Sequence, residues 1–294
     1  MNRITCTIAV LFMLVVHIPV EAAAANVGLN DVIATVEQSF RQGTTGKAPV
    51  TDFAANFFQR TLLADGQREM RGDGQMTVQL PAGNTPLMFR FEYFRPNQQE
   101  IVCNGRVLWI YHPDNREVIL SDVSFLYNRS SLNFDRDRAV NFLHGLSSIS
   151  RDFQINFAAG MFDPAGNYVL ELTPRRAMLN TRRILLVVNR ESVLSFVAGT
   201  GGKERSMPGT LPSPRTQGPQ PQPRSPFGTT PPFGALRSDP FPILSTTTYD
   251  LEGNSTTLEL TNIQVNGHPS ETSFNFIVPG NVQIVRPSEQ NVPR

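Results

Sequence analysis

FRFEY at residues 89–93 and IVCNGRVLWIYHP at residues 101–113 form the most regular pattern in this chain. In the first segment aromatic residues alternate with charged ones, which is typical of a β-strand with one apolar face. The second segment is divided by Asn104-Gly105, a dipeptide that favours a two-residue hairpin turn. We therefore predict a strand at 89–93 and a hairpin that joins strands at 101–103 and 106–111.

Further strands are predicted on both sides of this block. Residues 74–80 alternate strictly, so that Met76, Val78 and Leu80 share one face. Strand-like segments are also expected at residues 53–61, 117–120, 153–157, 168–173, 183–189, 244–250, 256–260 and 274–278. Because many of the connections are short, these strands should pair as an antiparallel meander.

Two segments have the apolar spacing of amphipathic helices. The first, at about 29–42, carries Leu29, Val32, Ile33, Val36 and Phe40, and Asn30 or Asp31 could cap its start. The second, within about 134–149, carries Ala139, Val140, Phe142, Leu143 and Leu146. The predicted fold is therefore mainly β, with helices that cover one face of the sheet.

The N-terminal residues 1–25 have the layout of a secretory signal peptide. Arg3 precedes an apolar run at about 4–20, and four alanines at 22–25 supply small residues for cleavage near Ala25. The alternative is a membrane anchor, but the run is short for a span of about 20 apolar residues. We therefore expect a periplasmic protein that is free of the membrane.

A second unusual segment lies at about 199–242 and is dense in Pro, Gly, Ser, Thr and Gln. Such a composition buries too little apolar surface to offset the entropy of ordering, so we expect a disordered insert. Strand-like sequence flanks it, which favours one domain made of residues 26–198 and 243–286 over two domains joined by a linker. Residues 287–294 are expected to be a flexible tail.

The composition argues against several functional classes. A net charge of +1 gives no reason to expect nucleic acid as a partner. Once Cys6 is removed with the signal peptide, Cys103 cannot form an intrachain disulfide, and we expect it to be a packed or half-exposed thiol. The histidines of the mature chain, His112, His144 and His268, are far apart and belong to no catalytic or metal-binding motif. We therefore predict no catalytic residues, metal or cofactor, and treat a hydrolase as a minor alternative.

The aromatic residues of the central strands allow two interpretations. Phe89, Phe91, Tyr93, Trp109 and Met76 could be ordinary core. A curved sheet and its helices could equally leave an apolar cavity for a lipid-like ligand. Composition does not separate these alternatives.

The central block resembles the LolA family of periplasmic lipoprotein carriers. FRFEY, then Pro96, then IVCNGRVLWIYHP at 101–113 is similar to the family pattern F-R-W-x-Y, P, I-V-S-D-G-x-x-L-W-x-Y-x-P. Residues 53–59 resemble the early F-x-Q strand, and DLEGN at 250–254 with FNF at 274–276 and Pro279 resembles the end of the family sequence. The similarity spans most of residues 28–286 apart from the Pro-rich insert.

This resemblance implies an incomplete antiparallel β-barrel closed by α-helices, whose apolar cavity binds the acyl chains of lipoproteins. Such a monomeric carrier takes lipid-modified proteins from an inner-membrane lipoprotein-releasing transporter to an outer-membrane lipoprotein receptor. The family pattern places Phe89 on the cavity wall. To that wall we assign Phe91, Tyr93, Met76, Val78, Leu80 and Trp109, and to the lid helices Val36, Phe40, Phe142 and Leu143.

The chain also departs from the family pattern. Some members hold the lid closed with an arginine before a proline, where this chain has Leu80 before Pro81, and residues 82–86 are extra. Arg175, Arg176, Arg182 and Arg183 surround one predicted turn, which is either a solvated hairpin or a docking surface for an acidic partner. A different function for the same fold would be an envelope sensor or structural module that binds a protein or glycan without lipid transfer.

Overall fold

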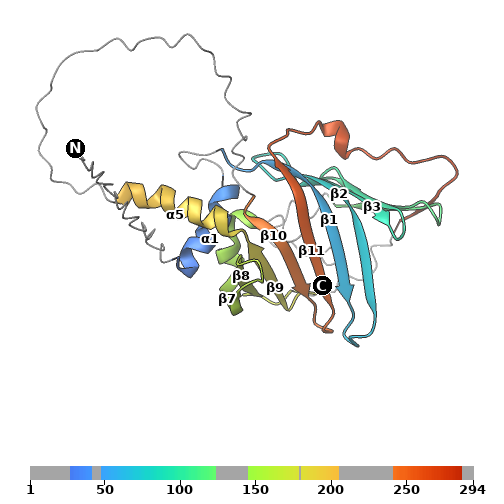
Figure 1. Cartoon of the computed structure of the whole chain (residues 1–294). Coiled ribbons are helices and arrows are strands. Elements are labelled where there is room, and N and C mark those ends of the chain that lie inside the picture. The colour runs from blue at the N-terminus through green and yellow to red at the C-terminus, as the bar shows by residue number, and fades with distance from the viewer. Residues whose placement is uncertain (1–26, 42–47, 124–144, 179, 205–240, 287–294) are drawn as a thin grey trace, which may run out of the picture.

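The computed structural model describes residues 27–41, 48–123, 145–178, 180–204 and 241–286. Within these ranges the strands form one curved, open sheet, with the hairpins projecting along one side (Figure 1). The sheet order is β12-β6-β5-β4-β3-β2-β1-β11-β10-β9-β8-β7. The strand bounds are β1 Asp52–Leu62, β2 Glu69–Gln79, β3 Met88–Arg95, β4 Gln99–Cys103, β5 Val107–His112, β6 Glu117–Asp122, β7 Phe153–Phe162, β8 Tyr168–Pro174, β9 Arg183–Val188, β10 Ile243–Tyr249, β11 Ser255–Val265 and β12 Gln283–Val285.

The sheet consists of two antiparallel meanders that meet where β1 pairs with β11. This confirms the predicted mainly β fold and the curved antiparallel sheet, which is not closed into a barrel. One pairing differs, because the short β12 lies parallel to β6. The strand predicted at 274–278 is wrong: a 3-10 turn, η2 Glu271–Phe274, leads instead into an extended segment that reaches β12.

The Asn104-Gly105 hairpin is present with a longer connection than predicted. Cys103 pairs with Leu108, and β5 begins at Val107. The Asn104 side-chain oxygen accepts hydrogen bonds from the backbone N–H groups of Arg106 and Val107 at 3.0 and 2.9 Å. Gly105 has a φ of 87°, a conformation that glycine adopts at little cost.

The first predicted helix is confirmed as α1, Leu29–Phe40. Its N-cap is Gly28, whose backbone N–H donates to the Asp31 carboxylate at 2.8 Å. Most of the second predicted helix, including Phe142 and Leu143, lies outside the described residues. Its described end is a 3-10 turn, η1 Leu146–Ser148, followed by α4 Ile149–Asp152.

A third helix, α5 Arg190–Glu204, was not predicted. The Asn189 side-chain oxygen accepts the Ser192 N–H at 3.0 Å and so caps its start. Because α5 continues to Glu204 and Phe241 is buried, the structured domain extends into both ends of the segment expected to be an insert at 199–242.

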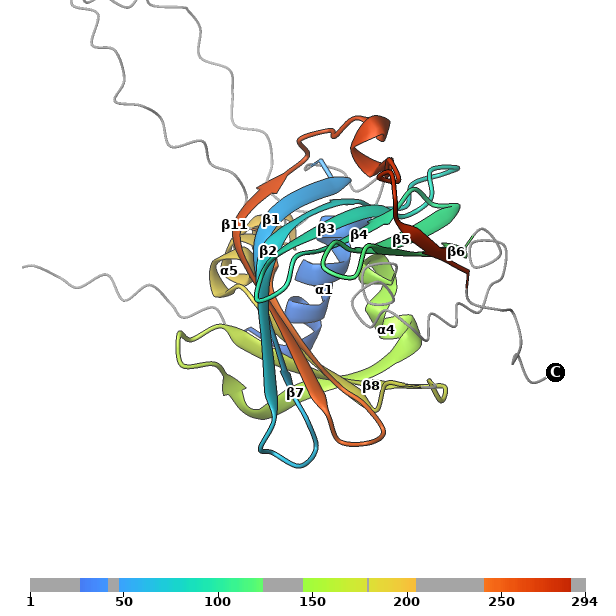
Figure 2. The same ribbon diagram turned by 90° about the vertical axis from the view of Figure 1, so that its right-hand side faces the viewer.

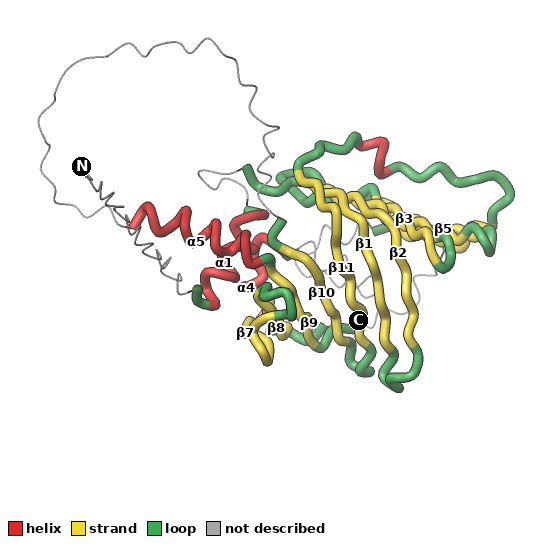
Figure 3. The backbone as a smooth tube through the Cα atoms, viewed as in Figure 1, coloured by secondary structure: helices red, strands yellow, loops and turns green. Residues whose placement is uncertain are grey.

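The helices lie together on the concave side of the sheet, and α1 runs inside its curve (Figures 2 and 3). Val32 and Val36 of α1, Leu146 and Ile149 near α4, and Val193 of α5 are buried against inward-facing strand residues. The core is therefore built between the concave face of the sheet and these helices, which bury their apolar stripes there.

Candidate functional site

The predicted site residues of β2 and β3 lie on the concave face. The strand registers align Phe53, Val78, Phe89 and Cys103 across β1–β4, and one step along they align Ala55, Met76, Phe91 and Ile101. Neighbouring residues in such a row share a face of the sheet. Phe89 and Phe91 are 2% and 5% exposed, so both belong to the packed interior.

An aromatic cluster forms the centre of this face. The Phe91 ring lies 5.7 Å from the rings of both Phe57 and Phe89, and the Phe57 ring lies 4.8 Å from Tyr93. The Tyr93 hydroxyl donates to the Gln59 side-chain oxygen at 2.9 Å. Edge-to-face geometry of this kind adds to simple apolar burial. Sequence reasoning missed Phe57 and Gln59, whose position follows only from the pairing of β1 with β2.

Leu80 and the two described residues that were assigned to a lid, Val36 and Phe40, also reach the interior. Leu80 is buried just beyond β2, and its N–H donates to the Thr51 carbonyl at 2.8 Å. Val36 and Phe40 face the core from α1, and Phe40 packs edge-on against Phe241 at 5.6 Å. A leucine in this apolar setting cannot provide the hydrogen bonds that a lid arginine would supply.

Trp109 does not belong to this face, and its assignment to the cavity wall is wrong. Trp109 pairs with Val102, and Val102 pairs with Arg90. Because Arg90 follows Phe89 in β3, these three side chains lie on the convex side, opposite that of Phe89. There the Phe276 ring lies 6.3 Å from Trp109 and 5.6 Å from Tyr111. Trp109 therefore anchors the C-terminal segment to the back of the sheet.

The convex side also carries a group of charges. Arg90 forms ion pairs with Glu92 and Glu100, and its guanidinium donates to the Ser273 carbonyl at 3.3 Å. Partial burial raises the pKa of Glu100 although the Arg90 charge opposes this shift. These polar contacts hold the C-terminal segment and leave the concave face apolar.

The concave face becomes more exposed toward the hairpin tips. Along β1, Phe53 and Phe57 are buried, whereas Gln59 and Thr61 are partly exposed. Met70, which pairs with Thr61 on the same face, is 57% exposed. We call this region, formed by Gln59, Thr61 and Met70, the open end of the concave face.

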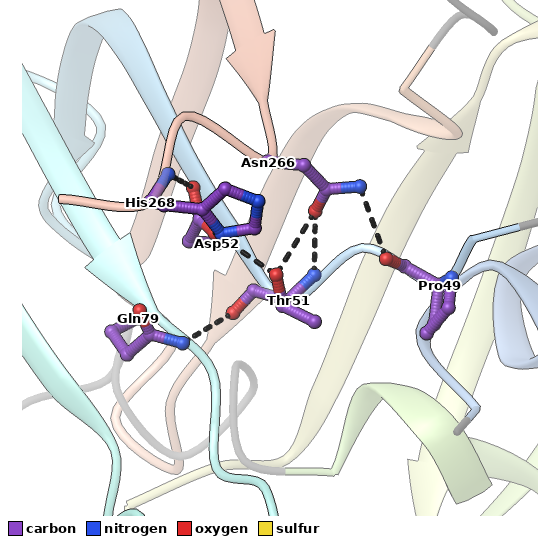
Figure 4. A network of polar contacts seen from close by, with 6 residues as sticks. All are labelled: Pro49, Thr51, Asp52, Gln79, Asn266 and His268. Atoms are coloured by element: carbon purple, nitrogen blue, oxygen red, sulfur yellow. Dashed lines mark hydrogen bonds and ion pairs between the residues drawn. The ribbon is translucent and has the colours of Figure 1, made fainter. Parts of the chain in front are cut away.

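A polar network holds the opposite end of β1 (Figure 4). The Asn266 side-chain oxygen accepts from the Thr51 N–H at 2.8 Å, and its amide donates to the Pro49 carbonyl at 3.1 Å. Asp52, 2% exposed, accepts from the His268 N–H at 3.0 Å and lies 3.3 Å from its imidazole Nδ1. The network ties the segment that follows α1 to the end of β11.

The described residues offer little for catalysis. None of them form a group of three or more His, Cys, Asp or Glu side chains that could hold a metal. Cys103 is buried on the concave face, and its sulfur accepts the Gly105 N–H at 3.4 Å. The helices in the described ranges are all too short or too polar to span a bilayer.

Residues 48–200, about half of the chain, match the family described as outer membrane lipoprotein carrier protein LolA. The outer-membrane lipoprotein carrier protein of Pseudomonas aeruginosa is 25% identical over 150 residues, which are 50% of this chain and 64% of that protein. The chain therefore spans less than two thirds of the length of this relative.

A second relative and one solved structure are also similar to this chain. The outer-membrane lipoprotein carrier protein of Actinobacillus succinogenes is 27% identical over 109 residues, covering 37% of this chain and 47% of that protein. A LolA superfamily protein of known structure from Nitrosomonas europaea is 16% identical, with coverage of 85% of this chain and 98% of that chain and a TM-score of 0.37.

Proposed function

We propose that this chain, which belongs to the LolA family of outer membrane lipoprotein carrier proteins, holds the acyl chains of lipid-modified proteins against its concave face. The observation that carries the proposal is the continuous apolar face built around Phe57, Phe89 and Phe91 and covered by α1. The function requires no cofactor and no covalent step.

The physical reason for such a face is the cost of exposed acyl chains. Transfer of an acyl chain from lipid into water costs about 0.8 kcal/mol per CH₂ group. A carrier must replace the bilayer with another apolar surface and must later release the chain. The helices that cover the concave face supply this surface and could move away from the sheet, which is itself held together by continuous backbone pairing.

The wider role in the proposal is a periplasmic shuttle. The carrier would act as a monomer after removal of residues 1–25, taking lipoproteins from an inner-membrane transporter to an outer-membrane receptor. The relatives named as lipoprotein carriers support this role. The absence of the lid arginine, with Leu80 buried in its place, implies that this chain controls its helices through other contacts.

The test is binding of a fluorescent acylated peptide to the purified mature chain. Phe89→Glu places a carboxylate on the concave face and should weaken acyl binding at least tenfold, because a charge opposes acyl burial. In free energy, this loss of binding should exceed the loss of folding stability. Phe58→Glu is the matched control, because Phe58 is exposed on the convex side of β1. The Phe58→Glu protein should bind the acylated peptide normally.

A second variant keeps the test decisive if Phe89→Glu fails to fold, which would identify Phe89 as packed core. Tyr93→Glu changes a partly exposed residue of the same cluster and should fold. Folded Phe89→Glu and Tyr93→Glu proteins with unchanged acyl binding would refute the proposed site. Mass spectrometry of organic extracts should find acyl species in the gently purified protein, whereas a lipid-free protein with a tight protein partner would favour the sensor function.

A further inference from the structure

Three hairpin turns form a continuous rim beside the open end of the concave face. They are the β1–β2 turn at 63–68, the β10–β11 turn at 250–254 and the described part of the β8–β9 turn at 175–182. The Ala64 N–H donates to the Asn254 side chain at 2.9 Å, and the Arg182 N–H donates to the Tyr249 carbonyl at 2.8 Å. Figure 1 shows the β1–β2 and β10–β11 tips projecting side by side.

The rim has an excess of positive charge. Among the described residues of 60–71, 175–183 and 249–254, seven arginines face four carboxylates, those of Asp65, Glu69, Asp250 and Glu252. Asp250 is buried, and its carboxylate accepts the N–H groups of Glu252 and Asn254 at 3.0 and 2.8 Å. Much of the negative charge is therefore engaged within the rim itself.

Four of the seven arginines have partners. Arg68 pairs with Asp65, Arg71 pairs with Glu69, and Arg183 pairs with Glu171 and lies over the Tyr249 ring. Arg175 donates to the Ser150 carbonyl at 3.4 Å. Arg176 and Arg182 are exposed and have no carboxylate partner within the part of the chain that the structure describes, whereas the exposed Arg60 forms no ion pair there but helps to lower the pKa of Glu69. The guanidinium groups of Arg176 and Arg182 are available to an external anion.

Exposed apolar side chains lie among these charges. Leu251, at the tip of the β10–β11 turn, is 63% exposed, and Leu62 and Met70 are exposed at the base of the β1–β2 turn. A single exposed leucine is ordinary. Here, however, three apolar side chains share one set of protruding tips with unpaired arginines. Apolar groups that enter the headgroup region and arginines that pair with phosphate are the combination that holds proteins at an anionic membrane surface.

We propose that this rim docks the protein on a bilayer that contains anionic phospholipids. The β1–β2 and β10–β11 tips project from the sheet, so they fit a broad lipid surface better than the complementary groove of an acidic protein. Docking by this rim would present the open end of the concave face, with Met70, to the membrane. The proposal goes beyond acyl binding and does not depend on it.

Vesicle co-sedimentation of the full mature chain tests the proposal without any lipoprotein. Vesicles of phosphatidylcholine with phosphatidylglycerol should bind the protein at low salt, and pure phosphatidylcholine vesicles should not. Arg176→Glu/Arg182→Glu should weaken partitioning by about tenfold or more, because each arginine near an anionic surface contributes to binding. Leu251→Ser should weaken it by a smaller factor that salt does not change.

The matched control is Arg106→Glu/Arg286→Glu, which makes the same change of charge at exposed residues outside the rim. Partitioning close to that of the wild type is expected for this control, and equal loss in both double variants would refute the rim. A chain with residues 205–240 replaced by a short Gly-Ser linker should still bind, because Arg205, Arg215, Arg224 and Arg237 are not required. Loss of binding in that chain would assign the attraction to the Pro-rich segment instead.

Two further results would also overturn the proposal. One is the absence of any preference for anionic vesicles at low salt. The other is normal vesicle binding by Arg176→Glu/Arg182→Glu together with a failure to accept lipoprotein from the transporter, which would make the rim a protein-docking surface. Acylated-peptide binding, measured separately on the same variants, shows whether the concave face still works.

Discussion

Glu37 of α1 and Ser150 of α4 are joined by two hydrogen bonds. Glu37 Oε1 accepts from the Ser150 backbone N–H at 2.8 Å and from the Ser150 hydroxyl at 2.6 Å, while Oε2 pairs with Arg41 at 3.3 Å. Glu37 is largely buried, at 8% exposure. One carboxylate thus connects two of the helices that cover the concave face.

Glu37→Ala should release α4 from α1 and lower the free energy of unfolding by about 2 kcal/mol, the usual range for hydrogen bonds to a charged group. Urea unfolding measures this change, and hydrogen exchange should show faster opening at residues 149–152. Glu37→Gln keeps one acceptor oxygen and should fall between wild type and Glu37→Ala. Gln38→Ala, at the neighbouring position of α1, is the control, and a Glu37→Ala protein as stable as this control would contradict the connection.

Asn266 should stabilise the start of β1 through its side chain alone. Its φ of 55° is left-handed, so glycine fits the backbone while removing the bonds to Thr51 and Pro49. Asn266→Gly should cost about 1–3 kcal/mol in thermal or urea unfolding, for two to three lost hydrogen bonds. Asn262→Gly is the matched control, because Asn262 has a similar φ of 52° on an exposed part of β11, and it should be nearly neutral.

Gly74 should tolerate no side chain. A Cβ there would overlap the Glu92 carbonyl oxygen and lie 2.8 Å from Phe57 Cζ, so neither the backbone nor the aromatic cluster could stay in place. Gly74→Ala should destabilise the protein by about 1–3 kcal/mol or more, the cost of overpacking. Gly145→Ala serves as the control, since a Cβ at Gly145 meets nothing within 4 Å. Equal melting temperatures for the two variants would show that β3 can move away from β2.

The free energy of unfolding should fall as the pH rises through the range in which Glu100 ionises. Its pKa is raised by burial, so the folded state binds this proton more tightly than the unfolded state does, and ionisation favours unfolding. Glu100→Gln mimics the protonated form. It should match the wild type at a pH below the ordinary glutamate pKa of about 4.3 and become relatively more stable as the pH approaches neutrality. Chemical unfolding across this range measures the difference, and a lower stability of Glu100→Gln at neutral pH would show that the pair with Arg90 is a net gain.

Replacement of residues 205–240 by a short Gly-Ser linker should leave the melting temperature nearly unchanged or slightly raised. The structured domain on either side of this segment includes α5 up to Glu204 and the buried Phe241. Loop closure changes by only about 0.6 kcal/mol for each doubling of loop length, so a long connection adds little cost. A large loss of stability in differential scanning calorimetry would show that the segment is part of the fold.

The sequence was sufficient for features that depend on near neighbours in the chain. Alternation at 74–80 and 89–93 predicted strands, the Asn104-Gly105 turn predicted a hairpin, and the spacing of Val32, Val36 and Phe40 predicted α1. It also placed Met76 with Val78, and Phe89 with Phe91, on one face of their respective strands, because alternate side chains of a strand share a side. The turn of the β3–β4 hairpin was not predicted, however, and its register decides which face of β5 lies beside Phe89.

The tertiary structure alone decided the features that join distant parts of the chain. The register of β3 with β4 places Trp109 on the convex side, since Phe89 pairs with Cys103 and a one-residue shift would exchange the two faces. The pairing of β1 with β11, the bonds from Glu37 to Ser150 and the adjacency of Arg182 to Tyr249 bring together residues that no local pattern relates. Local alternation predicts that a strand has two faces, whereas burial depends on which helix and which strand finally cover each of them.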